Sequence, residues 1–184
     1  MTLAALAGVG VLAAQAAATA PSVANAAGKA HGSTLPTTSS SATANPAASN
    51  ATGANALPAG SGSGLRVVYA EAAKRVWLVS ASNAVVRTIT IVPGTVAVPT
   101  GTYTVTDKLS SLTGTDGTQV QYVVLFGKLH VNGASLALGF DAVANVTGLP
   151  SPPTARTAAV RMAQADAQAL FNFSSGGTDI VVMA

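Results

Sequence analysis

The sequence predicts a mainly β domain over residues 65–184, an antiparallel β-sandwich or barrel-like sheet with one principal helix near the C-terminus. Short runs rich in Val, Ile, Tyr and Trp alternate with turn residues at the spacing of all-β domains. Only the segment 160–173 has the apolar periodicity of a helix. All eight aromatic residues, and every charged residue except Lys29, lie beyond residue 64. The packed core is therefore expected after that point.

Seven segments have the composition of half-buried strands, because β-branched and aromatic residues favour a pleated surface. Clusters of small and polar residues separate them, as turns require. Asn132-Gly133 is the strongest hairpin signal among these clusters, and 81–84 and 113–118 are further turns. The predicted strands are 65–70, 75–80, 85–92, 102–106, 120–126, 136–140 and 178–183.

The predicted helix, 160–173, has its apolar residues at helical spacing and is rich in strong helix formers. Gly176 and Gly177 follow it, and glycines at this position can adopt the left-handed conformation that ends a helix. The apolar positions are Val160, Ala163, Ala167, Leu170 and Phe171.

The first 26 residues are predicted to be a secretory signal peptide. An uncharged Ala/Leu/Val-rich stretch leads to Pro21 and the small-residue run Ala24-Asn25-Ala26, which is typical of a cleavage site. The alternative is an uncleaved anchor, because the stretch has about the length of a membrane span. Both interpretations place the domain outside the cytoplasm, in a secreted or envelope-associated protein.

Residues 27–64 are predicted to be a disordered linker of Ala, Ser, Thr, Asn, Gly and Pro. Such a composition buries too little apolar surface to fold alone. The linker is either a tether to the membrane or wall, or an inert spacer.

Composition excludes several classes of function. The net charge of +3 comes from 9 Lys+Arg against 6 Asp+Glu, without a basic block that would bind nucleic acid. The absence of cysteine excludes disulfides, thiolate zinc sites and a cysteine nucleophile. Two histidines and six carboxylates leave little for a metal cluster, so we expect no metal and no cofactor.

Several short motifs follow one another between residues 66 and 181. They are Arg66–Tyr69 with Arg75–Val79, Val92-Pro93-Gly94, Pro99–Tyr103, Val160-Arg161-Met162 with Asp166-Ala167 and Leu170-Phe171, and Gly177-Thr178 with Val181. In this order and spacing they resemble the L,D-transpeptidase catalytic domain (the YkuD-like family) of bacterial cell-wall enzymes. In that family a thiolate attacks a D-amino-acid carbonyl of the peptidoglycan stem peptide, and a histidine activates the thiol.

Aligning the chain on Val160-Arg161-Met162 shows where it departs from the family. Ala159 then occupies the position of the nucleophilic cysteine, and Ala158, Thr157 and Arg156 occupy the preceding Gly, His and Ser positions. A methyl group has no lone pair to donate. Because the chain has no cysteine at all, no shift of the alignment restores cysteine-dependent transpeptidation.

The resemblance also implies a base histidine on a strand upstream. Phe140, 19 residues ahead of Ala159, is placed at that position by its context. His130 lies 29 residues ahead of Ala159, beyond the Asn132-Gly133 turn, and fits less well. It is the only histidine of the domain, and its alternative role is a hydrogen bond at a strand end.

Arg161 is the best retained feature of the motif. Its planar guanidinium can hold a carboxylate bidentately, with help from the N-terminus of the predicted helix. Stem peptides carry carboxylates, so a groove beside Arg161 and Arg156, with His130 and Asp141 as further candidates, is the predicted ligand site. The alternative is that Arg161 pairs with Asp166 or Asp141 and only holds a loop.

Other catalytic groups have little support in the sequence. Ser135, Ser151 and Thr157 lack the motifs that surround serine nucleophiles. Asp141 and Asp166 would form a glycosidase-like carboxylate pair only at a suitable separation.

Three hypotheses of function follow. The first is a secreted, catalytically inactive relative of the L,D-transpeptidases that binds peptidoglycan stem peptides or a wall-synthesis partner, with no nucleic-acid partner and no membrane span once the signal is cleaved. The second is a structural or interaction module without a peptidoglycan ligand, favoured if the protein's own side chains, Phe140 among them, fill the groove. The third is an acyl-transfer enzyme with a substituted nucleophile.

Overall fold

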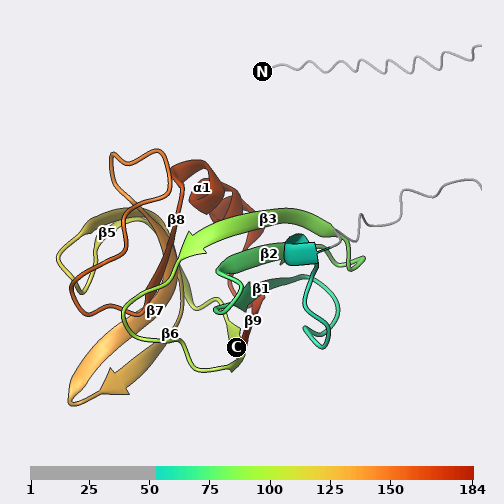
Figure 1. Ribbon diagram of the computed structural model, residues 1–184, viewed down its shortest axis with the longest axis horizontal. Helices are drawn as coiled ribbons and strands as arrows, with labels where there is room; N and C mark the ends of the chain where they lie inside the picture. The colour runs from blue at the N-terminus through green and yellow to red at the C-terminus, as the bar shows by residue number, and fades with distance from the viewer. Residues whose placement is uncertain (1–52) are drawn as a thin grey trace, which may run out of the picture. The chain divides into compact units, whose positions relative to one another are not determined.

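A computed structural model describes residues 53–184 (Figure 1). The predicted signal peptide and most of the predicted linker lie outside these residues. After a short 3₁₀ turn, η1 (Gly53–Asn55), the described chain forms nine strands and one α-helix. They are β1 (Arg66–Ala70), β2 (Arg75–Val79), β3 (Val85–Val92), β4 (Gly101–Thr104), β5 (Asp107–Thr113), β6 (Gln119–Val131), β7 (Ala134–Val143), β8 (Ala159–Met162), α1 (Gln164–Phe173) and β9 (Asp179–Met183).

All nine strands belong to one sheet, in the order β4-β9-β1-β2-β3-β8-β7-β6-β5. Consecutive strands β4 and β5 stand at opposite ends of this order, although only residues 105 and 106 separate them. A connection this short requires the sheet to curl until its two edges approach, and Figure 1 shows the curl. The fold is therefore the mainly β, barrel-like sheet with one helix that the sequence predicts.

The sheet is mixed rather than purely antiparallel. β1 is parallel to β9, and β7 is parallel to β8. Parallel neighbours need a crossover connection. The 144–158 loop provides one between β7 and β8, and the long return through β2 to α1 provides the other.

The large core cluster lies between the sheet and α1. Ala167 and Leu170 are the buried positions of the helix, and they pack against the cluster with Phe140, Phe126 and Tyr69. The rings of Tyr69 and Phe140 meet edge to face at 6.1 Å. These aromatic residues supply much of the apolar area that holds the curled sheet together.

A second, smaller cluster lies around Trp77. Leu57 packs against it, and the Trp77 Nε1–H donates to the Asn55 carbonyl at 2.9 Å. Residues 55 and 57 of the predicted linker therefore contact the described domain. Composition does not show this, because the contacts use one leucine and backbone carbonyls rather than many large side chains.

The start of the predicted helix is corrected. Residues 159–162 form β8, and the helix begins only at Gln164. β8 lies between β3 and β7, where Ile91 pairs with Met162 and Gly139 pairs with Ala159. Pairing on both sides overrides the local helical pattern.

Strand β5 was not predicted from the sequence. Its sequence DKLSSLT is largely polar, and its residues are mostly exposed or half-buried because it is an edge strand. The turn between β6 and β7 agrees with the hairpin predicted at Asn132-Gly133. Asn132 and Gly133 have φ angles of +52° and +79°, as a two-residue hairpin turn requires.

Candidate functional site

A cavity of about 240 Å³ opens beside Ala159. The parallel pairing of β7 and β8 sets Gly139 next to Ala159, and Asp141 next to Arg161. Alternate residues of each strand face the cavity, and those between them face the core. The lining residues are Leu112, Thr113, Gly114, Thr115, Val120, Val123, Leu125, Ala137, Gly139, Asp141, Thr157 and Ala159.

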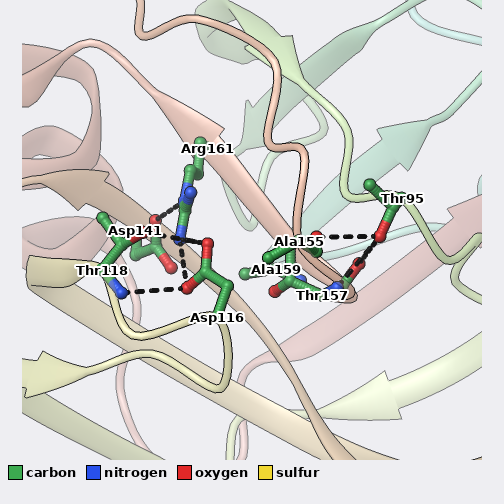
Figure 2. Close-up of polar contacts among 8 residues, drawn as sticks. All are labelled: Thr95, Asp116, Thr118, Asp141, Ala155, Thr157, Ala159 and Arg161. Carbon is green, nitrogen blue, oxygen red and sulfur yellow. Dashed lines mark hydrogen bonds and ion pairs between the residues drawn. The ribbon is translucent and has the colours of Figure 1, made fainter.

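The chain leading into Ala159 is held by the turn after β3. The Thr95 hydroxyl accepts the Thr157 N–H at 3.0 Å and donates to the Ala155 carbonyl at 3.2 Å (Figure 2). The Val96 N–H donates to the Thr157 carbonyl at 3.0 Å. Gly94 makes this approach possible, because a Cβ there would lie 2.4 Å from the Thr157 carbonyl oxygen. The backbone at Ala159 is therefore rigidly placed.

Arg161 is buried in an ion cluster (Figure 2). Its Nη2 contacts both oxygens of Asp116, at 3.0 and 2.8 Å, and its Nε lies 3.4 Å from Asp141 Oδ1. Asp116 belongs to the turn between β5 and β6, and the Thr118 hydroxyl also donates to it at 2.9 Å. Asp116 thus holds the arginine from across the cavity wall.

The cluster contains two carboxyl groups and one guanidinium, so one negative charge lacks a partner when both carboxyls are ionised. Burial raises the pKa of Asp141 to about 7, although the positive charge of Arg161 opposes the rise. Burial acts in the same direction on Asp116, but hydrogen bonds from Thr118 and Arg161 outweigh it and hold the pKa of Asp116 below its usual value. Below about pH 7, Asp141 is therefore the carboxyl group of the cluster that carries a proton.

The residues that line this cavity include no thiol. Ala159 presents a methyl group, and its backbone N–H donates to the Thr157 hydroxyl at 3.2 Å. That hydroxyl is the one nucleophile candidate from the sequence that lines the cavity. A serine-type nucleophile needs a base within hydrogen-bond reach, and no histidine lines the cavity.

The cavity contains only some of the residues singled out from the sequence. Asp141, Thr157 and Ala159 line it, and Arg161 lies behind its wall. Phe140, placed at the family's histidine position, points into the core instead, so it does not fill the cavity. Its neighbours Gly139 and Asp141 face the space.

The remaining sequence candidates lie elsewhere. Arg156 is exposed in the loop before β8. His130 is exposed and pairs with Ser135, four residues along β7 from Gly139, or about 13 Å at the rise of a strand. Asp166 pairs with Arg87 at 2.7 Å, so the second carboxylate of the glycosidase-like pair is bound to another partner.

Sequence reasoning missed Asp116. It stands in the TGTDGT turn, 45 residues before Arg161, and an Asp followed by Gly is normally a turn former. Its hydrogen bonds to Thr118 fit that role as well. Only the curl of the sheet, which brings the β5–β6 turn to β8, reveals it as the partner of Arg161.

The described residues carry two further negative findings. Between 53 and 184, no three His, Asp or Glu side chains are grouped so that they could hold a metal ion. No helix in that part of the chain is long and apolar enough to cross a membrane.

Comparison with solved structures gives the fold its name. An L,D-transpeptidase from Stackebrandtia nassauensis matches with a TM-score of 0.53 and 16% identity, covering 66% of this chain and 56% of that one. An L,D-transpeptidase in complex with imipenem matches with 0.50 and 15%, covering 66% and 60%. The Ldtfm–avibactam carbamoyl enzyme matches with 0.50 and 17%, covering 65% and 49%.

The chain therefore has the L,D-transpeptidase fold, which confirms the resemblance seen in its motifs at the level of the fold. It spans about half to three fifths of the solved chains that it matches. No family model matches the sequence, and no curated protein matches it significantly.

Proposed function

We propose that this protein is a catalytically inactive member of the L,D-transpeptidase fold that binds a short portion of a peptidoglycan stem peptide in the cavity beside Ala159. One observation supports the proposal: a cavity lies beside Ala159, the residue that the motif alignment matches to the family's nucleophilic cysteine. The predicted signal peptide adds that the protein acts outside the cytoplasm, in the cell envelope.

We propose that the ligand contacts the walls of the cavity rather than the guanidinium of Arg161. The Nη2 of Arg161 is held by Asp116, and both side chains are less than 5% exposed. A ligand carboxylate would have to displace a buried ion pair. The exposed polar groups of the lining are instead those of Thr113 and Thr115, beside aliphatic side chains, whereas Thr157 and Asp141 are only 1% and 4% exposed.

The volume limits what enters. Sites for drug-sized ligands have about 300–1,000 Å³, whereas this cavity has about 240 Å³. It suits one small residue of a stem peptide rather than a longer stretch. Recognition of a D-alanine-like methyl group by the aliphatic wall fits that size.

Binding to cell-wall sacculi tests the proposal. The full chain should co-sediment with purified sacculi above a Ser/Thr-rich control polypeptide. Ala159→Leu, which fills the cavity, should reduce the bound fraction at least fivefold. The matched control is Ala165→Leu on the exposed surface of α1, which should bind as the unmodified protein does. Equal sedimentation of both variants, or none with the unmodified protein, would contradict the proposal.

A second candidate function is an interaction module without a peptidoglycan ligand. It is favoured because the buried ion pair with Asp116 occupies Arg161, which then does not bind a ligand carboxylate. In that case the sacculi assay is negative, while the folded domain still captures a wall-synthesis protein irrespective of Ala159→Leu. The two functions are thereby separated by one pair of variants.

A further inference from the structure

A buried charge lies near the N-terminal end of β1, away from the Ala159 cavity. Arg66 is only 3% exposed. Among residues 53–184, no carboxylate lies within ion-pair distance of its guanidinium. A buried charge without an opposite charge is costly, and burial lowers the pKa of Arg66 accordingly. A bound anion would neutralise this charge and so lower the cost of burying it.

Neutral groups hold the guanidinium in place, but the donors on its Nε–Nη2 edge lack good acceptors among the described residues. Nη1 donates to the Gly64 carbonyl at 2.8 Å and to Asn83 Oδ1 at 2.9 Å. Among the residues that the structure describes, Nη2 donates only to the Ser61 hydroxyl, at 3.4 Å, and Nε has no acceptor. Nε–H and one Nη2–H point to the same side of the planar group, the geometry that binds a carboxylate or phosphate with two parallel hydrogen bonds.

The loop over this edge is built from glycines. Gly60, Gly62 and Gly64 have φ angles of +77°, +84° and +83°, with one serine between each pair. Left-handed residues in alternation can turn successive backbone N–H groups toward one side and so form a concave anion site. Asn83 Oδ1 also accepts the Gly64 N–H at 2.8 Å, which joins the loop to the arginine.

A groove beside the loop leaves room for a ligand. An open groove of about 540 Å³ is lined by residues 56–62 with Arg66 and Val85. A Cβ added at Gly60 or Gly64 would meet nothing within 4 Å. The loop therefore has open space at Gly60 and Gly64, while Ser61 between them is buried against Arg66. Ser61 Oγ, at 3.4 Å, stands where an oxyanion oxygen would lie at about 2.8 Å.

We propose that Arg66 and the Gly60–Gly64 loop form a binding site for a small oxyanion, a carboxylate or a phosphate group, held side-on by Nε and Nη2. The site is independent of the proposed stem-peptide cavity. It lies on the β1–β2 side of the molecule, where the cyan segment in Figure 1 runs, whereas β5 and β7 are toward the other end.

Nuclear magnetic resonance of the ¹⁵N-labelled full chain tests the site. Sodium phosphate and sodium acetate are added separately, with sodium chloride keeping the ionic strength constant. Saturable shifts are expected at the Arg66 Nε–H and at the amides of Gly62 and Gly64. Saturation by phosphate alone assigns a phosphate-bearing ligand, saturation by acetate alone assigns a carboxylate, and both together support the shared chemistry.

Two variants separate the effect of the guanidinium's hydrogen-bond geometry from the effect of its positive charge. Arg66→Lys keeps the charge but lacks the two parallel donors, so the affinity should fall at least tenfold. The matched control, Arg75→Lys on β2, whose guanidinium donates to Thr90 at the surface, should leave it unchanged. Absence of saturable shifts with both salts in the unmodified protein would overturn the proposal, and so would equal affinity in Arg66→Lys. The titration of the unmodified protein decides even where Arg66→Lys fails to fold.

Discussion

Asp141 shows how a single residue sets the electrostatics of the site. It faces the cavity from β7, and its Oδ1 lies 3.4 Å from the Arg161 Nε without hydrogen-bond geometry. Because Asp116 already neutralises the arginine at 2.8 Å, ionised Asp141 would be a buried charge in excess. Protonation is the less costly solution, since burying a neutral carboxyl group costs less free energy than burying an unpaired carboxylate.

The stability of the protein should therefore depend on pH in an unusual direction. The folded protein keeps a proton on Asp141 up to about pH 7, whereas the unfolded chain releases it near 3.8. Between these values the free energy of unfolding should fall as pH rises, by about 1.4 kcal/mol per unit and roughly 4 kcal/mol in all. Chemical denaturation at a series of pH values measures this slope.

Asp141→Asn is the control for that slope, since it removes the titrating group with little change of shape. The variant should show a flat profile between about pH 4 and 7. Asp116 contributes with the opposite sign, because its pKa is lowered, and its stabilisation is lost only as the pH falls below the ordinary range of a carboxyl group. An unmodified protein whose stability rises from pH 4 to 7 would contradict the account of Asp141.

When Asp116 is removed, Arg161 should form its ion pair with Asp141 instead. In Asp116→Ala the buried Arg161 loses its closest partner, which costs about 3 kcal/mol, the lower end for a broken buried pair because a second carboxyl is at hand. Burial, the main cause of the raised pKa of Asp141, stays, but this pKa should fall because the charge of Asp116 no longer raises it. Carboxyl ¹³C resonances report this directly. An unchanged pKa of Asp141 would mean that the three groups are not coupled.

At the scale of elements, strand pairing decides where the site lies. β8 was predicted as the first turn of a helix, because Val160 and Ala163 have helical spacing. Its pairing with β3 and β7 is invisible to a local pattern. This pairing moves Arg161 from a helix N-terminus, where it would face a ligand, to a strand, where it is buried beneath Asp116.

The turn after β3 should be as important to the site as the strands. Gly94→Ala would bring a Cβ to 2.4 Å from the Thr157 carbonyl oxygen, and to 3.0 Å from further backbone atoms of residues 158 and 159. Backbone atoms can move aside only at a large cost in free energy. We therefore expect the free energy of unfolding to fall by about 1–3 kcal/mol and binding to sacculi to weaken. Thermal unfolding and co-sedimentation measure the two effects.

Gly148→Ala is the matched control, since a Cβ at Gly148 meets nothing within 4 Å. Its stability should stay within about 0.5 kcal/mol of the unmodified protein. If Gly94→Ala is equally harmless, the turn does not fix the chain at Ala159.

At the scale of the whole molecule, the order of motifs was sufficient to predict the fold. The mainly β sheet, the single helix and the hairpin at Asn132-Gly133 follow from periodicity and turn chemistry. The contacts of Asp116 with Arg161, and of Asn55 with Trp77, could not be predicted. Each joins residues far apart in the chain through a closure of the sheet or a loop, and neither leaves a pattern in the sequence.

The central claim is that the fold binds a wall peptide without transforming it. One measurement tests both halves: the full chain is incubated with muropeptides, and mass spectrometry quantifies the retained and the released species. We expect muropeptides to be retained unmodified, with at least fivefold less retention by Ala159→Leu and no free D-alanine or crosslinked dimer. Release of D-alanine that Thr157→Ala abolishes would show a substituted nucleophile and contradict the claim, as would retention no greater than that of Ala159→Leu.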